Sequence, residues 1–299
     1  MHAPELKPGN AARVYWHHAA HAGRPLVVLY LHGFSASPGE AGALPEQMAD
    51  ALAANGYVHR WPGHGLAAAD AMQGLTLAVL QSSALEALAQ AQRIGQRVAI
   101  VGSSMGATLG LWLAAQRPDA VAGVVAWSPG IRAADPASLE QVCATQAPLI
   151  DPRTRTPAAR AFWSETIHPD GFRALHDLFE RIAADPPWPR VHCPVFLGYY
   201  RAADGREDGI ASVPAMLQMF AALGTSPAHK QALAFDTGAH AIGSTHKTPL
   251  AGAVAQASIA FLQAQLHAVP HGGDGGARRV CAWGGRTLPP CWQRRDVAR

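Results

Sequence analysis

A serine lies at the centre of the segment Gly102-Ser103-Ser104-Met105-Gly106, which directly follows the apolar run 97–101. A G-x-S-x-G pentapeptide between a buried strand and a helix is typical of a sharp turn that presents the serine oxygen above a sheet. Glycine on both sides removes side chains that would collide with the neighbouring elements. The helix expected to begin near Met105 directs its N-terminal N–H groups to the same place. The pattern predicts that Ser104 is a nucleophile for acyl transfer; the alternative interpretation is a Gly/Ser-rich turn without chemistry.

A serine hydroxyl becomes reactive when a base accepts its proton, and His240 is the histidine that we predict for this role. It follows the apolar run 231–235, the last strand expected in the chain, in a loop that contains Gly238. On a sheet that carries such a turn, the acid follows the serine in the chain and the histidine follows the acid, each in a loop after a later strand. His246 is the alternative base, and a surface histidine without a catalytic role is the alternative interpretation of His240.

The acid that orients this histidine is expected in the loop 201–210, after the apolar run 195–200. We predict Asp208, because Gly209-Ile210 follows it and completes a turn that resembles the usual Asp-x-Val/Ile site of the acid. Asp204 is the alternative acid, since it lies nearer the end of the strand, and Glu207 is a further candidate. A buried carboxylate at this place would fix the histidine tautomer and stabilise the imidazolium. The acids that do not take this role are expected to be solvated loop charges.

The developing negative charge of an acyl-transfer reaction needs N–H donors, and His32-Gly33-Phe34-Ser35 is the expected donor loop because it follows the first buried strand. The predicted oxyanion-hole donors are the backbone N–H groups of Phe34 and of Met105, the residue after the nucleophile. Gly33 lets the backbone come close to a substrate. We expect a structural role for His32, with hydrogen bonds inside the loop.

Strands and helices alternate along the chain, which predicts a mostly parallel sheet with helices on both faces. The apolar or alternating runs typical of strands are 13–17, 26–31, 57–61, 97–101, 121–127, 195–200 and 231–235. The segments with helical periodicity or helix-ending signals are 42–55, 77–94, 105–116, the segment after the Ser212 cap, and 250–267. Between 131 and 190 this rhythm breaks, in a segment rich in proline and aromatic residues.

The composition favours a globular protein with a substantial core, in one large domain or two small ones: the chain has 299 residues, of which 49% are hydrophobic and 15% charged. The net charge of +3 comes from residues 271–299, with six arginines and two aspartates, so the near-neutral remainder does not favour nucleic-acid binding. No apolar run is long enough to cross a bilayer, so we expect no stable membrane insertion. The N-terminus lacks the pattern of a secretory signal, which makes the cytoplasm the expected location.

The histidines and cysteines do not suggest a metal site. The fifteen histidines are scattered without an H-x-x-x-H pair on a helical segment, and the four cysteines form no CxxC motif. No dinucleotide-binding fingerprint or Gly-rich phosphate cradle is present. We therefore expect neither a metal nor another cofactor. Residues 271–299 lack periodicity and differ in composition from the rest, and we expect this tail to be disordered or loosely attached.

The quoted motifs together resemble the α/β-hydrolase superfamily and, within it, the carboxylesterase and monoacylglycerol-lipase group. They are Leu31-His32-Gly33-Phe34, Gly63-His64-Gly65, the turn at Ser104, Asp208 and His240. The resemblance covers residues 12–267. It implies the α/β-hydrolase fold, with a sheet of about eight strands and a small cap inserted after the strand that follows the nucleophile helix. We accordingly expect a hydrolase domain over residues 1–270, with the cap at about 131–190.

The expected substrate is an uncharged carboxylic ester, with a small to medium apolar acyl group or a monoacylglycerol. Aromatic side chains of an apolar acyl or alcohol pocket are expected at Trp127, Phe162, Trp163 and Phe172, although the same residues could anchor the cap to the core. A thioesterase, an amidase or peptidase, or a C–C hydrolase would use the same fold and triad, because specificity resides in the pocket. A non-catalytic protein that binds a small apolar ligand is the alternative from another class. The oligomeric state does not follow from the sequence.

Overall fold

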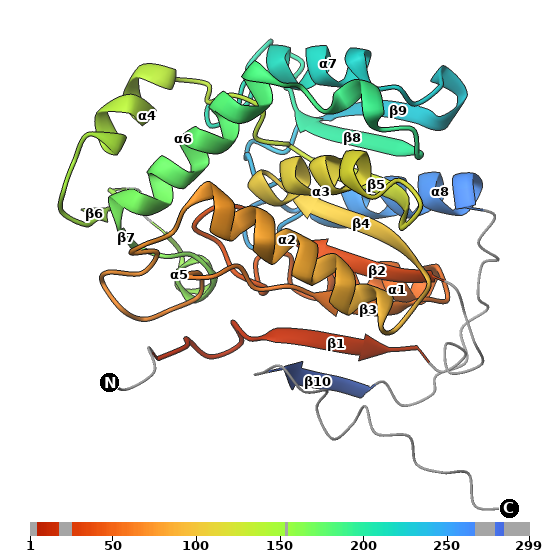
Figure 1. Ribbon diagram of the computed structural model, residues 1–299, viewed down its shortest axis with the longest axis horizontal. Helices are drawn as coiled ribbons and strands as arrows, with labels where there is room; N and C mark the ends of the chain where they lie inside the picture. The colour runs from red at the N-terminus through yellow and green to blue at the C-terminus, as the bar shows by residue number, and fades with distance from the viewer. Residues whose placement is uncertain (1–4, 18–25, 153–154, 267–278, 284–299) are drawn as a thin grey trace, which may run out of the picture.

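A single mixed sheet forms the centre of the protein in the computed structural model, which describes residues 5–17, 26–152, 155–266 and 279–283 (Figure 1). Within these ranges the strand order is β10-β1-β3-β2-β4-β5-β8-β9. The strands are β1 (Ala12–Trp16), β2 (Leu26–Leu31), β3 (Asn55–Val58), β4 (Arg97–Ser103), β5 (Val121–Trp127), β8 (Val195–Tyr200), β9 (Lys230–Phe235) and β10 (Arg279–Trp283). The six strands from β3 to β9 are parallel, whereas β1 pairs antiparallel with both β3 and β10.

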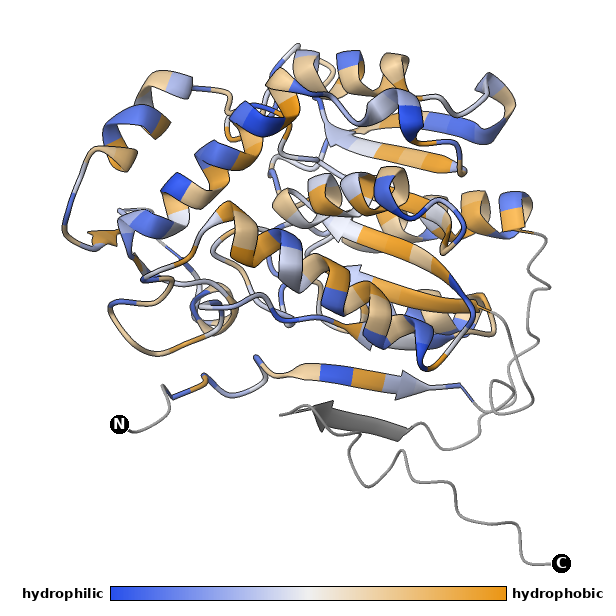
Figure 2. Ribbon diagram, viewed as in Figure 1, coloured by the Kyte–Doolittle hydropathy of each residue, from blue (hydrophilic) through white to orange (hydrophobic). Residues whose placement is uncertain are grey.

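The side chains of β2 show why such a strand is apolar throughout. Val27, Leu29 and Leu31 pack into the core on one face of the sheet, and Val28 and Tyr30 pack into the core on the other. Successive strand residues point to opposite faces, and helices cover both faces here, so residues 27–31 are all buried. Figure 2 shows the same feature as orange colour along the central strands, whereas the helices carry both blue and orange segments. The α/β-hydrolase fold expected from the sequence is confirmed.

The helices divide between the two faces of the sheet (Figure 1). α2 (Leu77–Gln92), α3 (Met105–Gln116) and α7 (Val213–Ala222) contribute to the core on one face, whereas α1 (Leu44–Ala51) and α8 (Ala251–Leu266) contribute to the core on the other. Two of these helices begin with a side-chain N-cap. Thr76 accepts a hydrogen bond from Val79 N at the start of α2, and Ser212 accepts one from Ala215 N at the start of α7.

The segment between β5 and β8 leaves the sheet and forms several elements. They are α4 (Pro136–Cys143), β6 (Leu149–Ile150), α5 (Pro157–Phe162), β7 (Thr166–Ile167), α6 (Pro169–Ala184) and the short 3₁₀ helix η2 (Trp188–Arg190); a second 3₁₀ helix, η3 (Pro227–His229), precedes β9. α4, β6 and β7 lie at the left of Figure 1, while α6 runs from there toward the centre. α6 packs Ala174, Leu178 and Ile182 into the main core, because residues four apart lie on one helical face. This segment lies where the sequence predicts an inserted cap.

Most predicted elements differ from the observed ones by only a few residues, and the two larger differences lie at one edge of the sheet. The predicted helix 42–55 is shorter as α1, because β3 already begins at Asn55 rather than at Tyr57. Residues 279–283, within the tail expected to lack regular structure, form β10. Pairing with β10 satisfies the N–H and C=O groups along the side of β1 that faces away from β3, so β1 is not an edge strand. The other residues of the expected tail lie outside the described residues.

Candidate active site

The turn between β4 and α3 holds Ser104 in an unusual backbone conformation. Ser104 has φ +51° and ψ −119°, and its N–H donates to the carbonyl of Trp127 at 2.9 Å. A Cβ atom on Gly102 would lie 2.4 Å from Ala107 Cα, and one on Gly106 would lie 2.1 Å from the carbonyl oxygen of Leu31. Both distances are far below van der Waals contact with backbone atoms. Glycine is therefore required at both flanks for lack of space, and the strained φ falls on the serine itself.

His240 links this turn to an acid (Figure 1 shows the strands that lead to each residue). Its Nε2 atom lies 2.8 Å from Ser104 Oγ and its Nδ1 atom lies 2.5 Å from Asp208 Oδ2. Ser104 follows β4, Asp208 follows β8 and His240 follows β9, so the ends of three parallel strands bring the three side chains together. An ionised carboxylate only accepts hydrogen bonds, so Nδ1 carries the imidazole proton and Nε2 is free to accept the proton of the serine hydroxyl.

The environment of Asp208 favours its ionised form. The side chain is fully buried, and Oδ1 accepts hydrogen bonds from the N–H groups of Ile210 at 2.8 Å and Ala211 at 3.2 Å. Burial acts to raise the pKa of Asp208, but the positive charge of His240 and the hydrogen bonds outweigh it and hold the pKa below its ordinary value. The site therefore offers a carboxylate that is ionised at neutral pH and fixed in orientation.

The other acids of this loop point to different partners. Asp204 is more than half exposed and pairs with Arg206 at 2.7 Å. Glu207 pairs with Arg201 at 2.6 Å. Of the three acids that the sequence left open, Asp208 is thus the one that the structure brings to His240. His246, the alternative base, stacks on Phe162 and faces the carbonyl of Gly39 at 3.2 Å.

The predicted donor loop lies against the nucleophile. A Cβ atom on Gly33 would lie 3.3 Å from Ser104 Cβ, so the backbone that leads to Phe34 passes directly beside the serine. Met105 is fully buried and is the first residue of α3, where an N–H has no partner within the helix. His32 is buried, faces the Gly33 carbonyl through Nδ1 and accepts a hydrogen bond from Trp61 N. This arrangement agrees with the expected structural role of His32.

Aromatic side chains of α6 pack against the donor loop and near the start of α3. Phe34 packs edge to face on Phe172 of α6, with ring centroids 5.1 Å apart. Phe179, two turns further along α6, lies beside Gly130: a Cβ atom there would lie 3.3 Å from the Phe179 ring and 3.7 Å from Met105 N. Phe34, Phe172 and Phe179 are all half-buried. The pocket role of Phe172 stays a prediction, and Phe179, which the sequence analysis did not select, is a further aromatic side chain near the start of α3.

The structure places the other three predicted pocket residues away from an open pocket. Trp127 is fully buried, and its Nε1–H donates to Ser258 of α8 at 3.0 Å. The prediction that it lines a substrate pocket is wrong, because side chains alternate along β5 and this one faces the core on the α8 side. Phe162 and Trp163 instead pack against His246, and Lys247 lies over the Trp163 ring. They anchor the cap, the alternative that the sequence left open.

A buried carboxyl group that the sequence analysis did not select also lies at this site. Glu40 is 2% exposed, and its Oε1 atom accepts hydrogen bonds from Tyr30 OH at 2.7 Å and from Gly33 N at 3.0 Å. Its place in a loop of small residues gives no periodic signal of burial. The one sequence signal for it is its position seven residues after Gly33, between the donor loop and α1.

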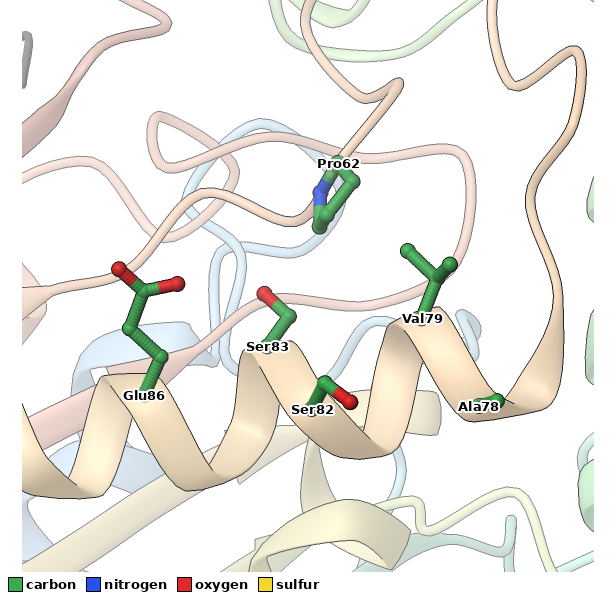
Figure 3. A pocket seen from close by; sticks show the side chains of 6 residues that line it. All are labelled: Pro62, Ala78, Val79, Ser82, Ser83 and Glu86. Carbon is green, nitrogen blue, oxygen red and sulfur yellow. The ribbon is translucent and has the colours of Figure 1, made fainter.

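A second serine–histidine contact lies under a surface hollow, away from Ser104. Pro62 and residues of α2, among them Ser83 and Glu86, line this hollow (Figure 3). Ser83 Oγ lies 2.8 Å from His59 Nε2, but the other ring nitrogen of His59 faces Tyr57 OH instead of a carboxylate. Burial lowers the pKa of His59 to about 3. Ser83 also lies inside a regular helix, whose N–H groups are already hydrogen-bonded, so this pair lacks an acid and an oxyanion hole.

Two findings on the described residues concern metal binding and membrane spanning. Their His, Cys, Asp and Glu side chains form no group of three or more that could hold a metal ion. None of the helices in the described ranges is both long and apolar enough to span a membrane.

Comparison with known proteins connects this geometry to a family. The sequence pattern described as "Alpha/beta hydrolase family" matches residues 28–277. A solved structure of the metagenome-derived lipolytic enzymes LipS and LipT has a TM-score of 0.73 with 21% identity, over 87% of this chain and 100% of that one. The monoacylglycerol lipase of Paleococcus ferrophilus has a TM-score of 0.63 with 20% identity, over 81% and 96% of the two chains. Est1E from Butyrivibrio proteoclasticus, solved with ferulic acid, has a TM-score of 0.59 with 14% identity, over 86% and 95%. A search of curated protein sequences gave no match.

Proposed function

The chain belongs to the alpha/beta hydrolase family, and we propose that it is a serine hydrolase that cleaves a carboxylic ester through an acyl-enzyme intermediate. The observation that carries the proposal is the continuous hydrogen-bonded path from Ser104 Oγ through His240 to Asp208. The distance of 2.8 Å between Ser104 Oγ and His240 Nε2 lies within the range at which a base accepts a proton. The path also ends at a buried and ionised acid, which is what the base requires.

The reaction follows from these positions. Ser104 Oγ attacks the ester carbonyl carbon while its proton moves to His240 Nε2, and the carbonyl oxygen becomes an oxyanion. The N–H groups of Phe34 and Met105 stabilise this oxyanion. The tetrahedral intermediate then collapses: the C–O bond to the alcohol breaks, and the alcohol leaves with the proton from Nε2. A water molecule, deprotonated by the same nitrogen, attacks the acyl-enzyme, and a second collapse releases the acid and restores Ser104.

The substrate that we propose is an uncharged ester with a small to medium apolar acyl group, or a monoacylglycerol. The side chains at the donor loop and near the start of α3 support this class, since Phe34, Phe172 and Phe179 are aromatic and apolar. The lipolytic and monoacylglycerol-lipase names of similar structures are consistent with it. A thioester or an amide would be cleaved by the same triad, so the fold does not distinguish these substrates from an oxygen ester. A comparison of hydrolysis rates distinguishes them.

A fluorophosphonate probe tests the catalytic serine. We expect the wild-type protein to be labelled at Ser104 and the Ser104→Ala variant to remain unlabelled, with an unchanged melting temperature. Ser83→Ala is the matched control, because Ser83 also contacts a histidine but lacks an acid partner. Its labelling should equal that of the wild type. A folded wild-type protein that is not labelled would contradict the proposal and favour a binding protein.

A substrate panel tests the class. We expect hydrolysis of p-nitrophenyl acetate, butyrate and octanoate and of a monoacylglycerol, with lower kcat/KM for acyl-CoA and peptide amides. If acyl-CoA were turned over faster than every oxygen ester, the proposed substrate class would be wrong and a thioester would take its place. The serine mechanism would not be affected by that result.

A further inference from the structure

Glu40 is a buried acid whose hydrogen-bond partners all donate. Tyr30 OH and Gly33 N–H donate to its Oε1 atom, and the Ser103 hydroxyl is a third partner of the same carboxyl group. Gly33 N–H can only donate, so Oε1 serves as an acceptor for the donor loop. Burying a carboxyl group costs free energy unless such partners compensate, and these partners tie Glu40 to the donor loop and to the turn before Ser104.

The carboxyl group and the nucleophile lie on either side of one point in the donor loop. A Cβ atom on Gly33 would lie 3.3 Å from Ser104 Cβ and 3.4 Å from Glu40 Oε2. Ser103, the neighbour of the nucleophile, is itself a partner of Glu40. Glu40 thus connects the loop that ends in the Phe34 N–H to the turn that carries Ser104.

The backbone at Glu40 is also attached to the loop that carries the base. The carbonyl oxygen of Glu40 accepts a hydrogen bond from Ser244 Oγ at 2.5 Å, and the neighbouring Gly39 carbonyl lies 3.2 Å from His246 Nε2. Both partners follow His240 by only a few residues. One turn therefore contacts the donor loop, the nucleophile turn and the histidine loop.

We propose that Glu40 is a positioning residue of the active site: its buried carboxyl group fixes the Gly33–Phe34 loop, and with it the Phe34 N–H, against Ser104. This inference rests on the proposed hydrolase function. It assigns the site a second acid, besides the one that contacts the imidazole directly. In the reaction, the fixed loop holds the Phe34 N–H where the oxyanion forms.

The environment of Glu40 acts on its ionisation in both directions. Burial holds the pKa of Glu40 above its ordinary value, although its hydrogen bonds and the charge of His240 act to lower it. The role of Glu40 therefore follows from where its carboxyl oxygens lie.

The variants Glu40→Asp and Glu40→Gln separate the position of the carboxyl oxygen from its charge. Glu40→Asp withdraws the oxygen from Gly33 N–H, so we expect kcat for p-nitrophenyl butyrate to fall about ten- to a hundredfold while KM stays within about twofold. Glu40→Gln keeps the length of the side chain and an oxygen that accepts from Gly33 N–H, so its kcat should stay within about tenfold of the wild type.

Controls make the result decisive. Glu207→Gln removes one negative charge from a surface ion pair and should leave kcat and KM unchanged. A wild-type kcat in Glu40→Asp would overturn the inference. A loss of kcat/KM in Glu40→Asp that comes from KM alone would also overturn it, because a misplaced oxyanion donor acts on the transition state. If Glu40→Asp does not fold, a loss of kcat greater than tenfold in folded Glu40→Gln overturns the inference, because that variant keeps the acceptor for the Gly33 N–H. Absence of hydrolysis and labelling in the wild type would instead overturn the proposed function itself.

Discussion

Replacing Asp208 by asparagine is the sharpest test of the proposed mechanism, because the structure determines how the new amide must sit. Oδ1 of Asp208 accepts the N–H groups of Ile210 and Ala211, while Oδ2 faces His240 Nδ1. In Asp208→Asn the carbonyl oxygen keeps the two backbone hydrogen bonds, so the NH2 group takes the place of Oδ2. The opposite orientation would turn the NH2 group toward these two N–H groups and leave both without an acceptor, at about 1–3 kcal/mol each.

The consequence is the wrong tautomer of the base. An amide that donates to Nδ1 leaves the imidazole proton on Nε2, and His240 can then no longer accept the proton of Ser104. The expected loss in kcat is on the order of 10⁴-fold, or about 5–6 kcal/mol of transition-state stabilisation. The substitution conserves volume, so the melting temperature should change little.

Initial rates of p-nitrophenyl butyrate hydrolysis measure the loss, with thermal unfolding recorded for each variant. Asp204→Asn is the matched control, because it makes the same chemical change four residues away, at a side chain that is exposed and pairs with Arg206. Its kcat should stay within about twofold of the wild type, as expected for an exposed ion pair. If Asp208→Asn retained more than a tenth of the wild-type rate, or if Asp204→Asn showed the large loss instead, the assignment of the acid would be wrong.

Two further predictions concern stability. Gly106→Ala should destabilise the fold by several kcal/mol, because the new Cβ would lie 2.1 Å from the Leu31 carbonyl oxygen. Gly252→Ala is also at the second position of a helix but has open space around it, so it should stabilise the fold by up to about 1 kcal/mol. Equal changes of the free energy of unfolding in urea would refute this account. Burial lowers the pKa of His59 to about 3 and that of His64 to about 4. Because the unfolded chain then binds more protons below pH 6.5, the free energy of unfolding should decrease as the pH falls from about 6.5 toward 4 and 3. His59→Asn should reduce this slope, and an unchanged slope between pH 4 and 7 would contradict the burial effect.

The elements of the sheet could be predicted closely because their signals are local. The run 26–31 is apolar at every position, as a strand covered on both faces requires, and it forms β2 with these bounds. Ser212 followed by Pro214 likewise marks the start of α7. β10 could not be predicted, since a five-residue strand at the edge is selected by its partner β1, more than 260 residues away in the chain. The bounds of the short cap elements depend in the same way on what they pack against.

The sequence by itself determined that a serine stands on a glycine-flanked turn after a buried strand, and that an acidic loop and a histidine follow later strands in the expected order. These features depend on backbone sterics and on residues close together in the chain. Only the tertiary structure distinguished Asp208 from Asp204, placed Trp127 in the core, and brought Glu40 to the donor loop. Each of these depends on which groups lie within hydrogen-bond or packing distance across the sheet, and such distances between residues far apart in the chain are fixed only when the strands are aligned.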